Sequence, residues 1–388
     1  MSRILLVNTT LGFNAPGRLV ETLAEGALAA GHDVRVAYSR GGSAKLPSPT
    51  LWHVGGRADI LSHVLLTRIT DMHARGSRRA TVDLVSKMLA WKPDVVHLHN
   101  LHGYWLDAPV LMAAVRRLGC RVVWTLHDMW PVTGHCAFPD IAHCHRYRTG
   151  CHDCPQMHQY PRSWVIDNSE RNFRIKQEMC AGLPSLILVV VSPWQRGCLR
   201  HTFLGAYPCR VIPNPIDPAF APVCEPEPMV VAAAASVWDH RKGLDRLRQL
   251  RELLPAEVDM RVAGLTRRQA LTLRGITALP RIATVGAMAR FYSSATVFVN
   301  PSRGETLGMV NLEARACGTP VVSMDSGGLV STVTPESGVA VPNGDVYSLA
   351  LAVKAAMEPG RYDRAAIAAA LRCEYDNDKI VGRYMELY

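Results

Sequence analysis

The sequence predicts an α/β protein made of two domains, each built around a parallel β-sheet. Short apolar runs rich in β-branched residues alternate along the chain with stretches whose apolar residues recur at helical spacing. The chain has 388 residues, of which 48% are hydrophobic, so it can fill two cores. Because this alternation runs through both halves, we expect each half to form its own doubly wound sheet.

The composition argues against a membrane-spanning chain. No apolar run reaches the length of a membrane span. The opening M-S-R-I-L-L-V-N-T-T becomes polar too early for a signal peptide and is typical of a first strand. We therefore expect a cytoplasmic protein, whose 11 cysteines are thiols or metal ligands rather than disulfides.

The net charge of +10 lies almost entirely in the first half of the chain. Residues 1–217 carry 24 Lys and Arg against 15 Asp and Glu, a net charge of +9. We expect no nucleic-acid partner, because no nucleic-acid-binding motif accompanies this charge. An anionic membrane surface or a diphosphate-linked lipid acceptor would also suit this positive charge, and either would place the protein at the inner face of the cell membrane. The basic residues of segment 57–91 alternatively form an ordinary solvated helix face.

The first half should contain a run of buried strands with helices between them. We expect strands at 4–8, 34–38, 94–97, 121–126 and 185–192, a helix at 18–30, and one or two amphipathic helices across 57–91. The glycine-bearing loop 9–17 is a candidate phosphate site, although such loops also occur without a ligand. His127 follows the strand 121–126, where open α/β sheets bind ligands, although a lone histidine is more often structural.

The second half restarts the same pattern after the proline-rich segment 221–228. We place the domain boundary there, with residues 1–220 in the first domain, 221–369 in the second, and a last helix at 370–388 crossing back onto the first. Further strands are expected at 230–237, 260–264, 284–286, 296–299, 321–322 and 338–341, with helices from 308 to Gly318 and after Asp345.

One stretch of the second half combines a strand, a loop, a helix and a second strand, from Thr296 to Asp325. Glu305 lies in its loop and Glu313 in its helix. The backbone amides of Thr306, Leu307 and Gly308 stand at the helix N-terminus, which suits a phosphate, and one carboxylate on each side could hold sugar hydroxyls. The alternative is that both are ordinary acids favoured by the helix dipole.

The string P-S-R-G-E-T-L-G-M-V-N-L-E-A-R-A-C-G-T-P-V-V resembles the nucleotide-sugar signature of glycosyltransferase family 4, the retaining enzymes of GT-B fold. This resemblance implies two Rossmann-like domains facing across a cleft. It implies that Glu305 contacts the hydroxyls of the donor sugar and Glu313 the ribose. The amides from Thr306 to Gly308 would then hold the diphosphate.

Further segments extend the resemblance over nearly the whole chain. Lys242 matches the lysine of the R-K-G-L segment, where it would bind the diphosphate, and His127 of W-T-L-H-D matches a histidine that binds the donor sugar. Gly17 matches the glycine loop that faces the donor phosphates. The family usually has an arginine where this chain has Ser236, which leaves Arg241 or a basic group of the first domain to supply that charge.

The subgroup that the chain resembles is that of colanic acid and exopolysaccharide glycosyltransferases, through N-A-P-G-R and H-D-M-W-P-V-T-G-H-C. The implied reaction moves a sugar from a nucleoside diphosphate sugar, with UDP or GDP as nucleotide, to a lipid-linked saccharide with retention. It needs no cofactor or divalent metal for catalysis. The alternatives are another GT-B enzyme, such as an epimerase or phosphorylase, and a non-catalytic saccharide-binding protein.

The segment after His127 carries four cysteines with histidines interleaved: Cys136, Cys144, Cys151 and Cys154. Cys151 and Cys154 form a C-x-x-C pair, the spacing of a metal knuckle, and four thiolates satisfy tetrahedral zinc. The segment is polar and lacks apolar periodicity, so a metal could supply its order. We expect a structural zinc site with these four cysteines as ligands. In an alternative ligand set, a histidine takes the place of one cysteine. Two disulfides, free thiols or a redox pair are the alternatives.

Overall fold

The computed structural model describes residues 1–183 and 185–388, and the chain divides into two compact units. The first unit comprises residues 1–213 and 378–388, and the second comprises residues 214–377. The second unit thus begins at Asn214 rather than at residue 221. It also keeps α12 (Arg364–Glu374), because the Arg364 guanidinium donates hydrogen bonds to the backbone oxygens of Ser293 and Ala295 at 2.8 and 2.9 Å.

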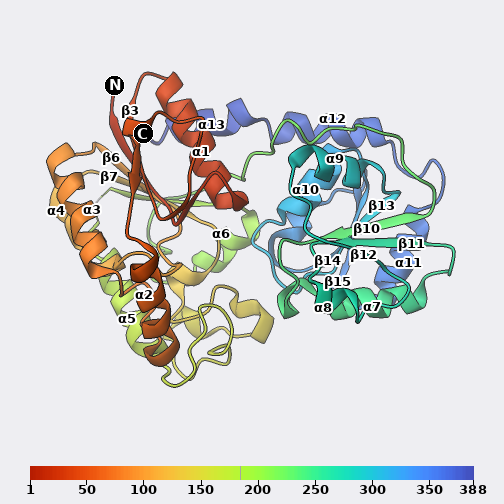
Figure 1. Ribbon diagram of the computed structural model, residues 1–388, viewed down its shortest axis with the longest axis horizontal. Coiled ribbons are helices and arrows are strands. Elements are labelled where there is room, and N and C mark those ends of the chain that lie inside the picture. Colours follow the sequence, from red (N-terminus) through yellow and green to blue (C-terminus); the bar gives the residue numbers. More distant parts are fainter. Residues whose placement is uncertain (184) are drawn as a thin grey trace. The chain divides into compact units, whose positions relative to one another are not determined.

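A seven-stranded parallel sheet forms the centre of the first unit (Figure 1). Its strands run in the order β5-β3-β1-β6-β7-β8-β9, and every neighbouring pair is parallel. The strands are β1 (Arg3–Val7), β3 (Asp33–Tyr38), β5 (Leu51–His53), β6 (Val95–Leu98), β7 (Arg121–Leu126), β8 (Leu186–Val190) and β9 (Cys209–Val211). A separate small pair joins β2 (Thr10–Leu11) to β4 (Arg40–Gly41).

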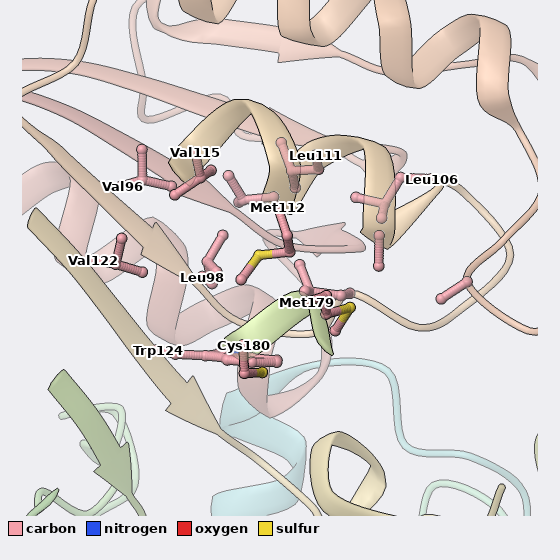
Figure 2. Packing of buried hydrophobic residues seen from close by; sticks show 14 of the residues in the cluster. Val96, Leu98, Leu106, Leu111, Met112, Val115, Val122, Trp124, Met179 and Cys180 are labelled. Atoms are coloured by element: carbon pink, nitrogen blue, oxygen red, sulfur yellow. The ribbon is translucent and has the colours of Figure 1, made fainter. Parts of the chain in front are cut away.

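Helices bury both faces of this sheet. They are α1 (Asn14–Ala29), α2 (Arg57–Thr70), α3 (Arg78–Trp91), α4 (Ala108–Leu118), α5 (Ser169–Cys180), α6 (Pro193–Leu199) and α13 (Asn377–Met385). Figure 2 shows the core between β6, β7, α4 and α5, where Trp124 and Leu98 pack with Met112, Met179 and Cys180. On α1, a Cβ at Gly26 would lie 2.4 Å from Val381, so this glycine lets the returning segment pack closely.

The second unit contains a six-stranded parallel sheet in the order β12-β11-β10-β13-β14-β15. Its strands are β10 (Val230–Ala234), β11 (Asp259–Ala263), β12 (Thr277–Leu279), β13 (Val297–Asn300), β14 (Val321–Asp325) and β15 (Gly338–Pro342). Helices α7 (Leu244–Leu253), α8 (Arg267–Ala270) and α11 (Val346–Ala356) lie on one side of this sheet. Helices α9 (Val285–Ser293), α10 (Met309–Ala316) and α12 lie on the other (Figure 1).

The α/β class with two parallel-sheet units is confirmed, two local predictions are corrected, and short edge strands were missed. Residues 284–286 were expected as a strand, but Thr284 caps α9 by accepting a hydrogen bond from the Ala287 amide at 3.3 Å. The edge strands β5, β9 and β12 were not predicted, because three residues are too few for a period to show. Helix α1 starts at Asn14 rather than Arg18, so Gly17 lies in its first turn.

Among the described residues, no helix has both the length and the apolarity needed to cross a bilayer.

Candidate functional site

The strand order of each sheet locates its ligand-binding edge. In the second unit, successive strands are added on one side of β10 up to β12 and on its other side from β13 onward, so the loops that follow β10 and β13 diverge from a common point. Ligands of open α/β sheets bind at the carboxyl ends of strands at such a switch point. Residues 241–242 follow β10 and residues 301–308 follow β13. The predicted residues of the second unit therefore meet at the position that its topology favours.

Glu305 is the centre of a buried charge cluster at this edge. Its Oε1 accepts a hydrogen bond from Arg241 Nη1 at 3.0 Å and a second from Lys242 Nζ. The glutamate is 8% exposed. Burial alone would raise the pKa of Glu305, but the charges of Lys242 and Arg241 outweigh it and lower the pKa. The carboxylate is therefore ionised, and two cations lie within reach of any anion bound there.

The loop 301–308 is held by close backbone packing on two sides. A Cβ at Gly243 would lie 2.4 Å from the Pro301 oxygen, and one at Gly328 would lie 1.9 Å from the Thr306 oxygen. The Gly328 amide also donates a hydrogen bond to the backbone oxygen of Glu305 at 2.7 Å. Only glycine permits this approach, so the Glu305 backbone is fixed by its neighbours.

Helix α10 begins directly after this loop. Gly308 caps it in the left-handed conformation at φ 88°, and a Cβ there would lie 2.3 Å from Leu329. The predicted phosphate-binding amides of Thr306, Leu307 and Gly308 therefore belong to the loop and cap that lead into a helix N-terminus. Two turns on, Glu313 is buried, and its Oε2 accepts a hydrogen bond from the Tyr292 hydroxyl at 2.9 Å.

The first unit places a row of histidines at its own switch point, which lies between β1 and β6. His97 and His99 come from β6 and the turn after it, and His127 follows β7. The His99 Nδ1 lies 3.0 Å from the His127 Nε2, and the two rings stack at 5.3 Å. Burial lowers the pKa of His97 to about 3 and that of His127 to about 4, and it lowers the pKa of His99 as well. All three imidazoles are therefore neutral at pH 7.

A second chain of hydrogen bonds lies beside this row. The His102 Nε2 is 3.0 Å from the Asp128 Oδ2, and the His102 Nδ1 is 2.8 Å from the Tyr160 hydroxyl. Burial opposes ionisation of Asp128, but the interaction with His102 lowers the pKa of the carboxyl. This chain links the end of β7 to the cysteine-bearing segment that follows.

Gly17 lies at the same edge as the end of β1. A Cβ at Gly17 would lie 2.9 Å from the Thr10 Oγ1, so a side chain there would crowd the strand end. The Gly17 amide donates a hydrogen bond to the Asn14 Oδ1 at 3.1 Å. In this structure that amide is thus engaged within its own helix turn.

The structure brings together the four cysteines predicted as metal ligands. All four border one small cavity in the first unit, together with His135 and His152. None of the four forms a disulfide.

Sequence reasoning missed several residues that complete these arrangements. They include Tyr292, Gly243 and the Gly327-Gly328 pair in the second unit, and Asn8, His97, His99, His102 and Tyr160 in the first. The glycine pair begins two residues after the end of β14, a signal that could have been read as close backbone approach. The partner of Glu313 could not have been found, because Tyr292 belongs to a helix whose start was predicted as a strand.

Two families match the chain, one over each half. A family described as "Glycosyltransferase Family 4" matches residues 16–220, and one described as "Glycosyl transferases group 1" matches residues 227–358. A relative from Escherichia coli K12, named as a colanic acid biosynthesis glycosyl transferase (WcaC), is 35% identical over 133 residues. That match covers 33% of this chain and 32% of the relative, so the chain spans about a third of that protein's length.

Solved structures share the fold across the whole chain. The sucrose-phosphate synthase of Thermosynechococcus elongatus superposes with a TM-score of 0.69 at 19% identity, covering 100% of this chain and 98% of the other. HepE of Anabaena, determined in complex with UDP and glucose, gives a TM-score of 0.67 at 15% identity and covers 100% and 99%. At these identities the likeness establishes the fold, which is that of GT-B proteins.

Proposed function

Because the chain belongs to glycosyltransferase family 4, we propose that it transfers a sugar from a nucleoside diphosphate sugar to a saccharide acceptor. One observation carries this proposal: the convergence of Arg241 and Lys242 on Glu305 at the switch point of the second sheet. Two cations beside a helix N-terminus make a binding site for a diphosphate. The same groups would stabilise the negative charge that develops on the leaving phosphate.

Glu305 has a second role in this proposal. While it pairs with the two cations, its carboxylate is satisfied within the protein. A diphosphate would compete for Arg241 and Lys242, and would free carboxylate lone pairs to accept hydrogen bonds from the hydroxyls of the donor sugar. Glu313, which accepts a hydrogen bond from the Tyr292 hydroxyl, would also accept hydrogen bonds from the ribose hydroxyls. We assign the amides from Thr306 to Gly308 to the phosphates.

In the first unit we propose that His127 contacts the transferred sugar as a neutral imidazole. Its low pKa, caused by burial, excludes a role as a resident cation at pH 7. With no enzymic nucleophile assigned, we propose front-face substitution with retention. The acceptor oxygen bonds to the anomeric carbon while the bond to the diphosphate breaks, and the acceptor proton passes to the leaving phosphate. We assign Gly17 to the donor phosphates more loosely, because Asn14 engages its amide in this structure.

Calorimetry with UDP and GDP tests the diphosphate site. Lys242→Ala should weaken binding of the preferred nucleotide on the order of 10- to 100-fold, as expected for a lost hydrogen bond between charged groups. The matched control is Lys354→Ala, which removes an exposed lysine of the same unit. Equal affinity in wild type and Lys242→Ala would contradict the assignment. The UDP bound in the HepE structure makes UDP the first nucleotide to test.

For the acceptor we propose a lipid-linked saccharide used in cell-surface polysaccharide synthesis. The name of the WcaC relative supports polysaccharide synthesis, and the basic charge of the first unit suits a diphosphate-linked lipid, whereas the name of the sucrose-phosphate synthase points to soluble sugar phosphates. Transfer of a radiolabelled sugar in membrane extracts separates the two. The label should move into the organic phase, and its appearance only in water-soluble product would overturn the lipid-linked acceptor. The anomeric coupling constant of the product, measured by NMR, tests retention.

We also propose that the first unit docks on an anionic membrane surface. Helix α2 exposes a stripe spaced by four residues, in which Arg57 precedes Leu61, Leu65 and Ile69. Leu61 is 69% exposed and Leu65 is 56% exposed. Such a face, with apolar side chains along one line, suits insertion at a membrane interface.

A loop continues this apolar surface. Trp164 and Val165 are 58% and 67% exposed, and the Trp164 amide donates a hydrogen bond to the Arg68 oxygen of α2 at 2.6 Å. The Arg68 guanidinium lies 5.6 Å from the Trp164 ring centre. Arg162 is exposed next to them. Cations around exposed apolar groups favour anionic lipid over neutral lipid.

Co-sedimentation with vesicles tests this docking. Binding should rise with the anionic lipid fraction, fall with salt, and be lost in Leu61→Asp/Leu65→Asp. Leu271→Asp is the matched control, because Leu271 is 87% exposed in the second unit. Equal binding of the double variant and wild type would rule out this surface, as would equal binding to neutral and anionic vesicles.

A further inference from the structure

The cysteine-bearing segment of the first unit encloses a cavity of ion size. The cavity has a volume of about 10 Å³ and is bordered by Cys136, Cys144, Cys151 and Cys154. A space of this volume holds about one water-sized sphere, which is too small for an organic ligand. Four cysteines that border one such space can supply the donor set that zinc prefers.

His135 supplies an independent observation at the same cavity, which it also borders. The side chain is fully buried, and its Nδ1 lies 2.5 Å from the Asp71 Oδ1. Its Nε2 is also buried and makes no hydrogen bond of ordinary geometry within the described residues, although the Gln159 backbone lies near enough to act on the pKa of the ring. A buried polar atom without a partner is costly. A histidine that binds metal characteristically donates its other ring nitrogen to a carboxylate, as His135 does to Asp71.

Lys176 adds a charge argument. It is 4% exposed, and its Nζ donates hydrogen bonds to the backbone oxygens of Trp130 and Thr133 at 2.6 and 2.8 Å. No carboxylate forms an ion pair with it within the part of the chain that the structure describes. Burial lowers the pKa of Lys176 to about 7, and negative charge on Cys151, Asp71, Cys136 and Asp128 opposes this fall. A thiolate–zinc centre carries net negative charge, so a buried cation beside it would be compensated.

The neighbouring trio of Asp71, His73 and His135 is the only group in the described chain whose ligand atoms all lie within 4.8 Å of one another. It does not make a separate metal site, because its atoms are already engaged. His73 Nδ1 accepts from Trp130 Nε1 at 2.9 Å, and the Asp71 Oδ2 faces the Asn172 amide at 3.2 Å. The trio instead orients His135. Since no three cysteine sulfurs are equally close, metal binding would also turn thiol side chains inward.

We propose that this cavity binds one structural zinc ion through Cys136, Cys151, Cys154 and a fourth ligand, which is Cys144 or His135. The site is closed, so it takes no part in the transfer reaction. Its role is to order a segment whose regular structure is limited to short 3₁₀ turns, at Pro139–Ala142 and Arg146–Arg148. That order extends to Tyr160, which holds His102 against Asp128.

Elemental analysis of the full chain, purified without added metal or chelator, tests the proposal without any assay of activity. Wild type should contain about one zinc per chain. Cys151→Ser/Cys154→Ser should contain none above background, while Cys373→Ser, which removes an exposed cysteine of the second unit, should keep it. Among Cys144→Ser and His135→Asn, the variant that loses zinc identifies the fourth ligand. Retention of zinc by both would overturn the proposed ligand set.

Two measurements on wild type keep the test independent of whether the variants fold. Titration of the thiols with an organomercurial should release zinc in proportion to the cysteines modified, as followed with a chromogenic chelator. Peptide mapping under non-reducing conditions should find these four cysteines reduced. A metal-free wild type that melts at the same temperature after incubation with zinc would overturn the proposal. Disulfides among these cysteines would overturn it as well.

Discussion

Glu305 shows how one side chain can hold two charges ready for a ligand. A buried carboxylate is costly unless it is paired, and here Arg241 and Lys242 both pair with it. The pairing also holds the Arg241 guanidinium and the Lys242 ammonium at the switch point, so the diphosphate would meet cations that are already positioned. Pre-positioned charges need no rearrangement when the leaving group develops its own charge.

Glu305→Gln should therefore separate binding from transfer. We expect kcat/KM to fall on the order of 10- to 100-fold or more, because hydrogen bonds to the sugar hydroxyls weaken when the carboxylate is neutralised. Binding of the nucleoside diphosphate should be retained or tighter, since the two cations lose their internal partner. Kinetics and calorimetry on the same preparations check both effects.

The control for this variant is Glu252→Gln, which changes an exposed glutamate of α7. Wild-type transfer by Glu305→Gln would refute the role of Glu305. A parallel loss of nucleotide binding and of helical signal in circular dichroism would instead show that the variant is misfolded.

At the scale of elements, the loop between β13 and α10 depends on its glycine neighbours. Gly328→Ala would place a Cβ 1.9 Å from the Thr306 oxygen, so the loop must move. We expect a loss of about 1–3 kcal/mol in the free energy of unfolding, as for overpacking, and weaker nucleotide binding. Urea unfolding and calorimetry measure the two.

Gly286→Ala is the matched change in an open place. Gly286 lies in α9, and a Cβ there would have no atom within 4 Å. This substitution should be neutral or slightly stabilising, because alanine loses less backbone entropy than glycine in a helix. If both glycine variants behaved alike, close packing of the loop would not be what fixes it.

The strand–loop–helix unit around Glu305 could be predicted from sequence because its signals are local. The apolar run of β13, the loop breakers and the helical period of α10 lie within 30 adjacent positions of Thr296–Asp325. Contacts between distant segments could not be predicted in this way. The pairing of Glu313 with Tyr292 depends on α9 being a helix. Residues 284–286 were predicted as a strand, whereas Thr284 caps the N-terminus of this helix.

The same limit applies in the first unit. His127 was singled out by its place after a strand, yet its stacking on His99 depends on β6 and β7 being neighbours in the sheet. The sequence placed both strands but not their order. Likewise, the cysteines of one short segment could be grouped from sequence, whereas Asp71 and Lys176, which surround them, come from α2's end and α5.

At the scale of the whole molecule, buried neutral histidines make stability depend on pH. Burial lowers the pKa of His63 to about 4, that of His97 to about 3 and that of His127 to about 4, all below the ordinary value of 6.5. The unfolded chain therefore binds more protons than the folded one between these values. Stability from these groups is complete above pH 6.5 and is lost as the pH falls.

We expect the free energy of unfolding to drop between about pH 6.5 and 5, with each such histidine adding up to about 1.4 kcal/mol per pH unit. Urea unfolding at several pH values measures the slope. His63→Gln should make the slope shallower, whereas His201→Gln, at an exposed position, should not change it. A slope that His63→Gln leaves unchanged would contradict the assignment.

The division of the first unit between residues 1–213 and 378–388 has a consequence for the timing of synthesis. The second unit is one uninterrupted segment, and domains fold as units while the chain emerges from the ribosome. The first unit lacks Tyr384 and Tyr388, the hydrogen-bond partners of Thr125 and His97, until its last residues appear. The second unit can therefore finish folding before the first unit, although most of the first unit is translated earlier. In ribosome-bound chains arrested with only residues up to 377 exposed, hydrogen exchange should find the second sheet protected and β6 and β7 still open, and full protection of those strands would contradict this order.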